Sequence, residues 1–113
     1  MFPSAIFTIP AVGQVGLTES EAIRRGFRAK VSKMPYDSNP TAGVRNETEG
    51  LVKVVYEADT ERLLGVHIIG AHAEDIVQIA AVAMRGGLKK SEVGAMHYVF
   101  PTLGGAVFDA MAA

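Results

Sequence analysis

Two apolar, β-branched runs separated by a short connection constrain the fold of this chain most strongly. Residues 51–57 (LVKVVYE) and 63–69 (LLGVHII) flank the mostly polar segment 58–62 (ADTER). Two such runs joined by about five residues predict an antiparallel hairpin. Because the centres of both runs lack regular polar alternation, we expect both faces of the hairpin to be covered. Helices would cover one face, and another chain is a candidate for the other.

The segments before the hairpin predict a short helix between two extended pieces. Residues 7–15 predict one extended piece with Pro10 at its edge or end, and Gly13 and Gly16 then allow a turn. Thr18 and Glu21 have the spacing of a capping box, which starts a helix that runs to about residue 25 and ends at Gly26. Apolar and polar residues alternate over 27–32 and predict a strand that Pro35 stops. Residues 36–46 read as a loop with a short helical turn near 41–44.

Three helices are expected after the hairpin. Residues 73–85 begin with acidic and end with basic side chains before Gly86 and Gly87, as suits a helix dipole. A weak helix over 91–96 would take Ser91 as its N-cap, and Thr102 can cap a last helix over 103–111. The order predicts one α+β domain over residues 1–113, with a mainly antiparallel sheet of four to five strands and helices on one face and at one end.

The apolar content of the chain favours an oligomer. Hydrophobic residues make up 49% of 113 residues, and a chain this short buries only roughly 60–70% of its unfolded surface. Residues 76–84 are apolar on almost every side of the predicted helix, which is unusual on the surface of a monomer. We therefore expect a homodimer.

Charge and composition exclude several classes of function. A net charge of −1 gives no electrostatic footprint for nucleic acid or for an anionic membrane. The longest apolar run is far shorter than the ~20 residues of a membrane span, and the N-terminus lacks the basic region of a signal peptide. The sequence contains no cysteine, which excludes disulfides and thiol catalysis within it and is compatible with the cytoplasm, where we expect the protein.

The titratable residues do not form a recognisable catalytic or metal-binding motif. His67 and His72 lie in a predicted strand and just before a helix, with no third ligand at suitable spacing, so we expect no metal. Glu74 and Asp75 are interpreted as partners of the helix dipole. Asp109 stands alone among apolar residues and could pair across a dimer or face water.

Several blocks of the sequence, in order, resemble one known family. They are PSAIFTIP at 3–10, VGLTE at 15–19, GLVKVV at 50–55, LGVHIIG at 64–70 and FPT at 100–102. Together they resemble the C-terminal dimerisation (interface) domain of class I pyridine nucleotide-disulphide oxidoreductases, a family that includes dihydrolipoamide dehydrogenase, glutathione reductase and mercuric reductase. The resemblance spans roughly residues 3–111. It implies an antiparallel sheet flanked by helices that pairs with a second copy across a two-fold axis.

The resemblance also implies cofactors that this chain does not bind by itself. Family members hold FAD and NAD(P) in domains upstream of this one and carry a redox cysteine pair there. The present sequence contains neither a Gly-x-Gly-x-x-Gly turn nor a cysteine. We expect the FAD- and NAD(P)-binding domains to lie outside these 113 residues and to be supplied in cis or in trans.

The acid–base pair of the family is missing at the matching positions. A histidine before Pro-Thr and a glutamate five residues later correspond to Phe100 and Gly105, so the resemblance implies no catalytic residue here. An aromatic residue at the first position resembles mercuric reductase and soluble transhydrogenase, which have tyrosine there. His97 could supply an imidazole if the local register slips. Phe100, Pro101 and Thr102 would lie near the flavin of the partner subunit in an assembled enzyme.

Two functions are compatible with these observations. The first is a homodimerisation domain of an FAD-dependent oxidoreductase, not catalytic by itself, either as a piece of a longer flavoenzyme or as a short independent chain. The second is a stand-alone enzyme or small-ligand-binding protein with a pocket at the dimer interface lined by His97, Tyr98 and Phe100. A visible flavin absorbance in the pure protein would distinguish the two.

Overall fold

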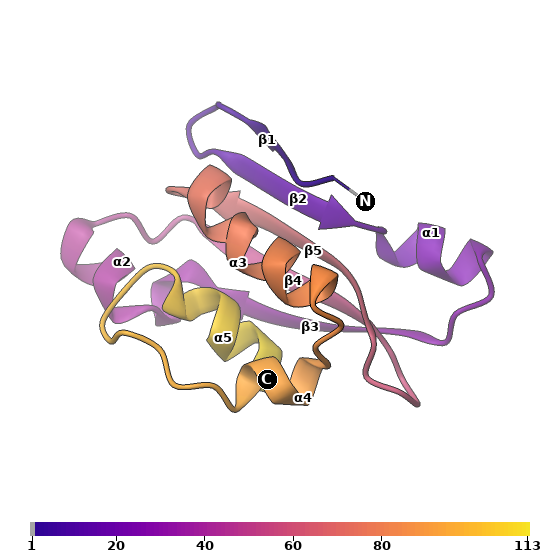
Figure 1. Cartoon of the computed structure of the whole chain (residues 1–113). Coiled ribbons are helices and arrows are strands. Elements are labelled where there is room, and N and C mark those ends of the chain that lie inside the picture. Colours follow the sequence, from indigo (N-terminus) through magenta and orange to yellow (C-terminus); the bar gives the residue numbers. More distant parts are fainter. Residues whose placement is uncertain (1) are drawn as a thin grey trace.

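The computed structural model describes residues 2–113, and within them five antiparallel strands form one sheet in the order β1-β2-β5-β4-β3 (Figure 1). The strands are β1 (Ser4–Ile6), β2 (Val12–Gly16), β3 (Ala29–Pro35), β4 (Gly50–Glu57) and β5 (Leu63–Gly70). The helices are α1 (Glu19–Arg24), α2 (Pro40–Arg45), α3 (Ala73–Arg85), α4 (Lys90–Gly94) and α5 (Gly105–Ala112), with a 3-10 turn η1 (Tyr36–Ser38). This α+β architecture confirms the predicted fold class.

The central hairpin forms as the sequence predicts. Strands β4 and β5 pair along their length, with Val54 opposite Val66 and a register shift at Val55/Tyr56. The amide of Glu57 donates to the carbonyl of Arg62 at 2.9 Å and closes the connection. These two strands lie in the middle of the sheet, between β2 and β3, so each of them pairs with a strand on both of its edges.

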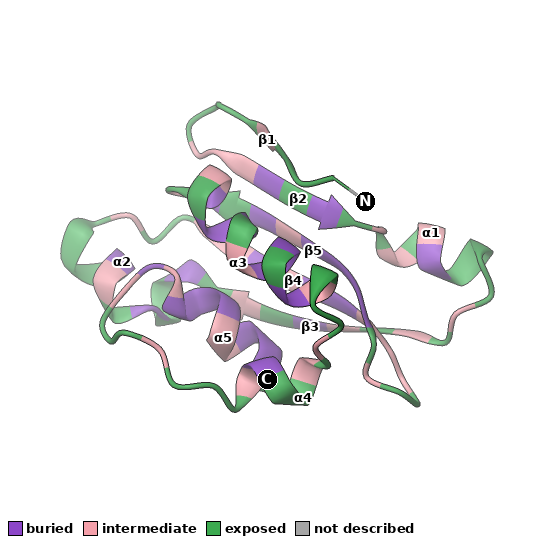
Figure 2. Ribbon diagram, in the orientation of Figure 1, coloured by how far each residue is buried: buried purple, intermediate pink, exposed green. Residues whose placement is uncertain are grey.

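Helices α3 and α5 cover one face of the sheet and enclose the main core (Figure 2). The core is built from Val15, Val52, Val54, Val66 and Ile68 of the strands, Ile76, Val77 and Ala80 of α3, and Val107, Ala110 and Met111 of α5. Gly13 allows the close approach of β2 to α3, because a Cβ there would lie 2.4 Å from the carbonyl oxygen of Ala73. Full burial of each Val or Ile side chain contributes roughly 1.5–3 kcal/mol.

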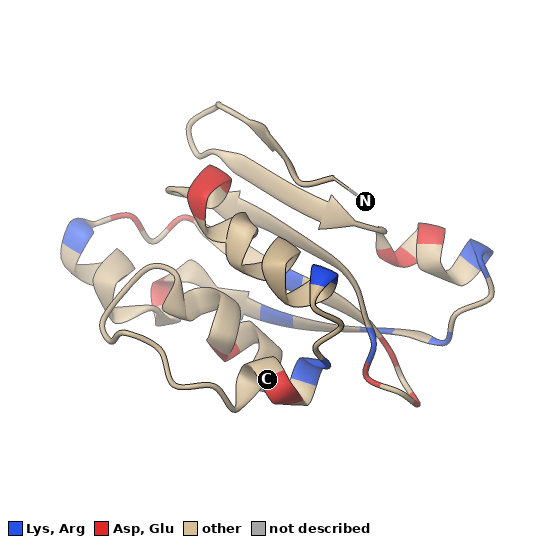
Figure 3. Ribbon diagram, viewed as in Figure 1, with Lys and Arg blue, Asp and Glu red and all other residues tan. Residues whose placement is uncertain are grey.

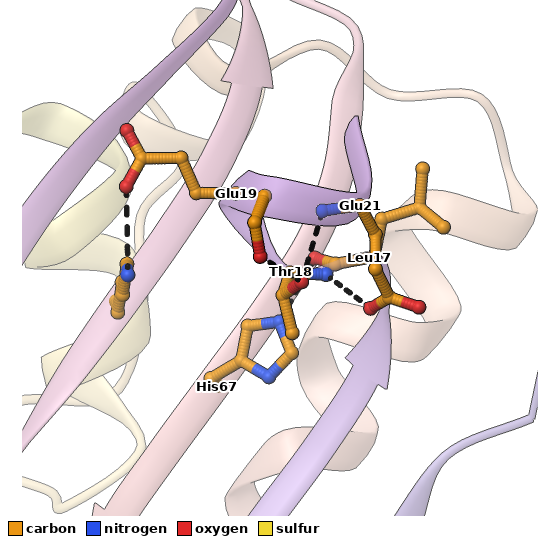
Figure 4. Close-up of polar contacts among 7 residues, drawn as sticks. Leu17, Thr18, Glu19, Glu21 and His67 are labelled. Carbon is orange, nitrogen blue, oxygen red and sulfur yellow. Dashed lines mark hydrogen bonds and ion pairs between the residues drawn. The ribbon is translucent and has the colours of Figure 1, made fainter. Parts of the chain in front are cut away.

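Helix α1 covers one end of the opposite face. Its predicted capping box is present: the Thr18 amide donates to the Glu21 carboxylate at 2.9 Å, and the Glu21 amide donates to the Thr18 hydroxyl at 3.2 Å (Figure 4). The imidazole of His67 donates through Nε2 to the Leu17 carbonyl at 2.9 Å, and Lys53 pairs with Glu19 at 3.8 Å. These contacts join α1 to β4 and β5, and Ala22 of α1 packs in a small cluster with Val55 and Leu64.

The rest of this second face stays uncovered within the chain, and we call it the open face. The strand registers align one apolar row across it, formed by Ile6, Val12, Ile69, Leu51 and Pro35. A polar row runs beside it, formed by Ser4, Gln14, His67, Lys53 and Lys33. Ile6 and Ile69 are 57% and 43% exposed. The hairpin is thus covered by helices on one face and only partly, by α1, on the other.

Helix α3 is buried more fully by its own chain than the sequence predicts. Ile76, Val77, Ala80, Ala81 and Ala83 are buried, whereas Val82 is 65% exposed. The apolar character of this helix, taken from the sequence alone, favours an oligomer, but β2, β5 and α5 of the same chain already cover most of it. Only the side that carries Val82 remains free.

The N-terminal segment also differs from the prediction. Residues 4–6 and 12–16 form two paired strands instead of one extended piece, with Ser4 opposite Gln14. Phe7 and Ile9 lie in the connection between them and are exposed. Gly13 and Gly16, predicted to allow a turn, belong to β2. Pairing with a neighbouring strand of the sheet determines the conformation of these residues, and the local sequence does not show which strand that is.

The segment predicted as a loop contains the predicted helical turn, as α2, and the additional turn η1, which is anchored by a buried tyrosine. Tyr36 of η1 is fully buried, and its hydroxyl donates to the carbonyl of Ala71 at 2.9 Å. Burial, reinforced by the charges of Glu74 and Glu47, raises the pKa of Tyr36, so the phenol stays protonated and keeps this hydrogen bond. The bond connects the segment to the start of α3.

The predicted N-cap of α4 is wrong by two residues. Lys89 occupies the N-cap position, and its amide donates to the Glu92 carboxylate at 2.8 Å, whereas Ser91 lies inside the helix. Other predicted helix ends are confirmed, since Gly26 and Gly87 follow α1 and α3 with φ of +88° and +72°. No helix among residues 2–113 is long and apolar enough to cross a membrane.

Removing the capping carboxylate should destabilise the fold in a pH-dependent way. The Thr18 amide lowers the pKa of Glu21 below its ordinary value of 4.5. A carboxylate whose pKa is lowered in the folded state stabilises the protein at pH values above its ordinary pKa. This contribution is lost as the pH falls through the pKa of the folded state. The difference in unfolding free energy between the wild type and Glu21→Gln, measured by urea titration, should be largest near neutral pH. A difference that stays constant into acid would contradict this account.

Candidate functional site

The connection between α4 and α5 contains the predicted site residues and carries exposed apolar side chains without charged neighbours in the sequence. Residues 95–104 contain no Asp, Glu, Lys or Arg (Figure 3). Val99 is 78% exposed and Phe100 is 67% exposed. Two large apolar side chains in water, without charges around them, are typical of a surface that contacts another molecule. We call residues 95–104 the apolar loop.

Hydrogen bonds from the α2 cap hold the apolar loop in place. The buried side chain of Asn39 donates to the carbonyl of Thr102 at 2.9 Å and accepts from the amide of Ala42 at 3.0 Å. The hydroxyl of Thr102 donates to the carbonyl of Val99 at 2.8 Å. Phe100 therefore lies between two residues that are joined directly, which limits the conformations of the loop.

The last helix starts two residues later than predicted, and its predicted N-cap is displaced likewise. Helix α5 begins at Gly105 instead of residue 103, and Gly104 occupies the N-cap position. Thr102 still contacts the start of the helix, because its hydroxyl accepts from the Gly105 amide at 3.2 Å.

Gly105 provides room for the ring of Tyr98. A Cβ at position 105 would lie 2.7 Å from Cε2 of that ring. The ring stacks on Phe108, with centroids 5.0 Å apart and planes inclined by 13°. Tyr98 is thus packed against the first turns of α5 and does not extend into solvent beside Phe100.

The carboxylate of Asp109 is the hydrogen-bond partner of Tyr98. The phenol donates to Oδ1 at 2.8 Å. The sequence leaves open a pair across a dimer or a carboxylate in water, and within the chain the partner of Asp109 is Tyr98. The hydrogen bond to Asp109, with partial burial and the negative charge, raises the pKa of Tyr98, so the phenol remains a donor.

This arrangement does not form an acid–base pair. Phe100 occupies the position where the family resemblance implies a histidine. Gly105 occupies the position of the glutamate that would orient it. His97 is exposed, and the Asp109 carboxylate accepts the hydrogen bond of Tyr98. General acid–base catalysis requires a titratable group positioned by a partner, and neither Phe100 nor Gly105 supplies one.

The other histidines lie apart from the apolar loop and in different surroundings. His67 is on the open face, whereas His72 precedes α3 and approaches Glu47 at 3.9 Å. The sequence prediction found no carboxylate suitably placed near His72; in the structure, ligand atoms of His72, Glu74 and Asp75 lie within 4.8 Å of one another. Glu74 and Asp75 are in the first turn of α3, as predicted for dipole partners.

The fold and the sequence define the family of this chain. It belongs to the pyridine nucleotide-disulphide oxidoreductase dimerisation domain family, whose model matches residues 2–111. It is 39% identical over 111 residues to dihydrolipoyl dehydrogenase 2 of Haloarcula marismortui, a match that covers 98% of this chain and 24% of that protein. It is 43% identical over 86 residues to mercuric reductase of Lysinibacillus sphaericus, covering 76% and 16% respectively.

A solved structure supports the same assignment. The HOCl-induced flavoprotein disulfide reductase RclA of Escherichia coli superposes with a TM-score of 0.92 at 26% identity, covering 98% of this chain and 26% of that one. The chain spans about a quarter of the length of the dihydrolipoyl dehydrogenases it matches, 24% in the Haloarcula protein. The predicted family and fold are confirmed.

A side chain at position 105 should disturb the packing of Tyr98. Gly105→Ala places a Cβ against the ring, so we expect a loss of about 1–3 kcal/mol in unfolding free energy, measured by urea titration. The loss should shrink in a Tyr98→Ala background, where the ring is absent. Gly43→Ala is the matched control, because a Cβ there meets nothing within 4 Å in helix α2. Equal effects at positions 43 and 105 would contradict the proposed contact.

Proposed function

We propose that this chain is the homodimerisation domain of an FAD-dependent oxidoreductase and contributes surface, not proton transfer, to the assembled enzyme. The observation that carries the proposal is the apolar loop, which exposes Val99 and Phe100 on a segment without charged residues. Exposed apolar side chains favour association because their burial removes them from water. Membership of the dimerisation-domain family supports a second copy of this chain as the partner.

The residues Phe100, Pro101 and Thr102 are proposed to face the flavin of the partner subunit. The polar side chains nearby have partners within the chain: the Thr102 hydroxyl donates to Val99, and the Tyr98 hydroxyl donates to Asp109. This part of the chain therefore does not fit FAD as a binding site of its own. FAD and NAD(P) would be bound by other domains, in cis or in trans, and the cofactors would supply the redox chemistry.

The missing acid–base pair limits the reaction that an assembled enzyme could perform. Thiol exchange that depends on an imidazole from this domain has no such group at Phe100, and Gly105 cannot orient one. We propose that the assembled enzyme takes protons from solvent or from another domain. We propose a cytoplasmic location, in keeping with a sequence that contains no cysteine.

Charges placed on the apolar loop should weaken a dimer without unfolding the chain. Sedimentation over a concentration series should show a species of twice the 12.0 kDa mass. Val99→Asp and Phe100→Asp should raise the dimer dissociation constant at least about tenfold, since a buried unpaired charge costs more than about 1.4 kcal/mol. Far-UV circular dichroism should stay unchanged, because both side chains are exposed in the single chain.

Two further variants make this test specific. Val44→Asp is the matched control, because Val44 is 89% exposed in α2 and lies outside the apolar loop. Ile6→Asp tests the open face. Dissociation by Ile6→Asp but not by the loop variants would show that the loop is not the interface, and a monomer at every concentration would contradict homodimerisation of this chain.

The absence of a flavin site in this chain is directly testable. The purified chain should be colourless and should remain so after incubation with FAD and gel filtration. Visible flavin absorbance that elutes with the protein would contradict the proposal and favour the alternative, a stand-alone protein with a ligand site lined by His97, Tyr98 and Phe100.

A further inference from the structure

A groove of about 690 Å³ lies between the first residues of β5, the end of α1 and the end of α3. Among its lining residues are the half-buried apolar side chains of Phe27, Met84 and Leu88, which we call its apolar floor, whereas Leu63 and Leu64 are buried in the two cores of the chain. Its rim carries Arg25, Arg62 and Lys89. The groove contains no residue of the apolar loop, so a ligand site in it is independent of the proposed function.

The three cations of the rim form no side-chain ion pair among the described residues. Glu21 is nevertheless close enough to Arg25 to interact electrostatically, and Glu92 accepts from the backbone amide of Lys89. Neither Asp nor Glu lines the groove. Among residues 2–113, the ion pairs are formed by Arg28, Lys53 and His72, not by Arg25, Arg62 or Lys89. Figure 3 shows basic residues in blue at the end of α1 and next to the start of α4. The groove is therefore positively charged, although the whole chain has a net charge of −1.

Two of these cations are fixed beside each other by the backbone. Arg62 and Lys89 are direct partners in an antiparallel β-bridge, and the amide of Lys90 donates to the carbonyl of Glu61 at 3.0 Å. Like charges directly opposite in an antiparallel pair are destabilising. An anion bound between them would relieve this repulsion.

The remaining contacts of Arg62 hold it at the edge of the apolar floor. Its guanidinium lies over the ring of Phe27, 5.5 Å from the centroid. A guanidinium stacked on an aromatic ring keeps its edge available for hydrogen bonds to a carboxylate, sulfonate or phosphate. An anionic group and an apolar surface thus meet at one place in the groove.

We propose that this groove binds a small amphiphilic anion, with its apolar body on Phe27, Met84 and Leu88 and its anionic group between Arg62 and Lys89. The volume of the groove falls within the range of small-molecule pockets, roughly 300–1,000 Å³. The charge of the rim selects the anion, and the apolar floor selects a ligand with a hydrocarbon or aromatic body over an inorganic ion.

The proposal is tested by NMR titration of the full chain, ¹⁵N-labelled, with naphthalene-2-sulfonate. The sulfonate should shift the amides of Arg62, Leu64 and Lys89 and saturate. The neutral analogue naphthalene-2-sulfonamide should bind at least severalfold more weakly. The double variant Arg62→Gln/Lys89→Gln should lower the affinity for the sulfonate roughly tenfold, since charge-assisted hydrogen bonds are lost.

The control variant removes the same charge elsewhere. Lys33→Gln/Arg45→Gln changes two exposed cations outside the groove and should leave the affinity unchanged. Lys89→Gln alone keeps the contact of Arg62 with Phe27 and replaces the double variant if that variant unfolds. Equal affinity for sulfonate and sulfonamide, equal loss in the control variant, or shifts confined to another surface would overturn the proposal.

Discussion

The arrangement of the chain depends on one set of buried side chains. Strands β4 and β5 direct these side chains to the same side of the sheet. Val52, Val54, Val66 and Ile68 lose essentially all contact with water beneath α3 and α5. A chain of this length supplies two helices for that face and only α1 for the other. The open face is the part of the second side that α1 leaves uncovered within these residues.

The apolar loop is a consequence of the same packing. Helix α5 has to lie on the sheet, where the hydroxyl of Ser32 donates to the carbonyl of Ala110 at 2.8 Å. The segment that leads into α5 is then held at the surface by Asn39 and Thr102. Its exposed side chains belong to a restrained segment, so association would require little additional ordering of the loop.

The acid–base pair that the family resemblance implies at positions 100 and 105 would need more than two substitutions in this chain. Gly105 leaves the space that the Tyr98 ring occupies, and the ring is held there by Phe108 and Asp109. A glutamate at position 105 would collide with this ring. The arrangement around Tyr98 therefore has to change together with Phe100 and Gly105 before an oriented imidazole could be accommodated.

Much of the fold could be predicted from the sequence because its signals act over a few residues. The hairpin, the capping box of Thr18 and Glu21, and the glycines after α1 and α3 each depend on neighbours along the chain, and the ordered blocks indicated the family. The tertiary structure alone decided which distant residues meet: Tyr98 with Asp109, Asn39 with Thr102, Arg62 opposite Lys89, and the apolar row of the open face. These contacts depend on strand register and helix placement, which are set by packing of the whole core and leave no local pattern in the sequence.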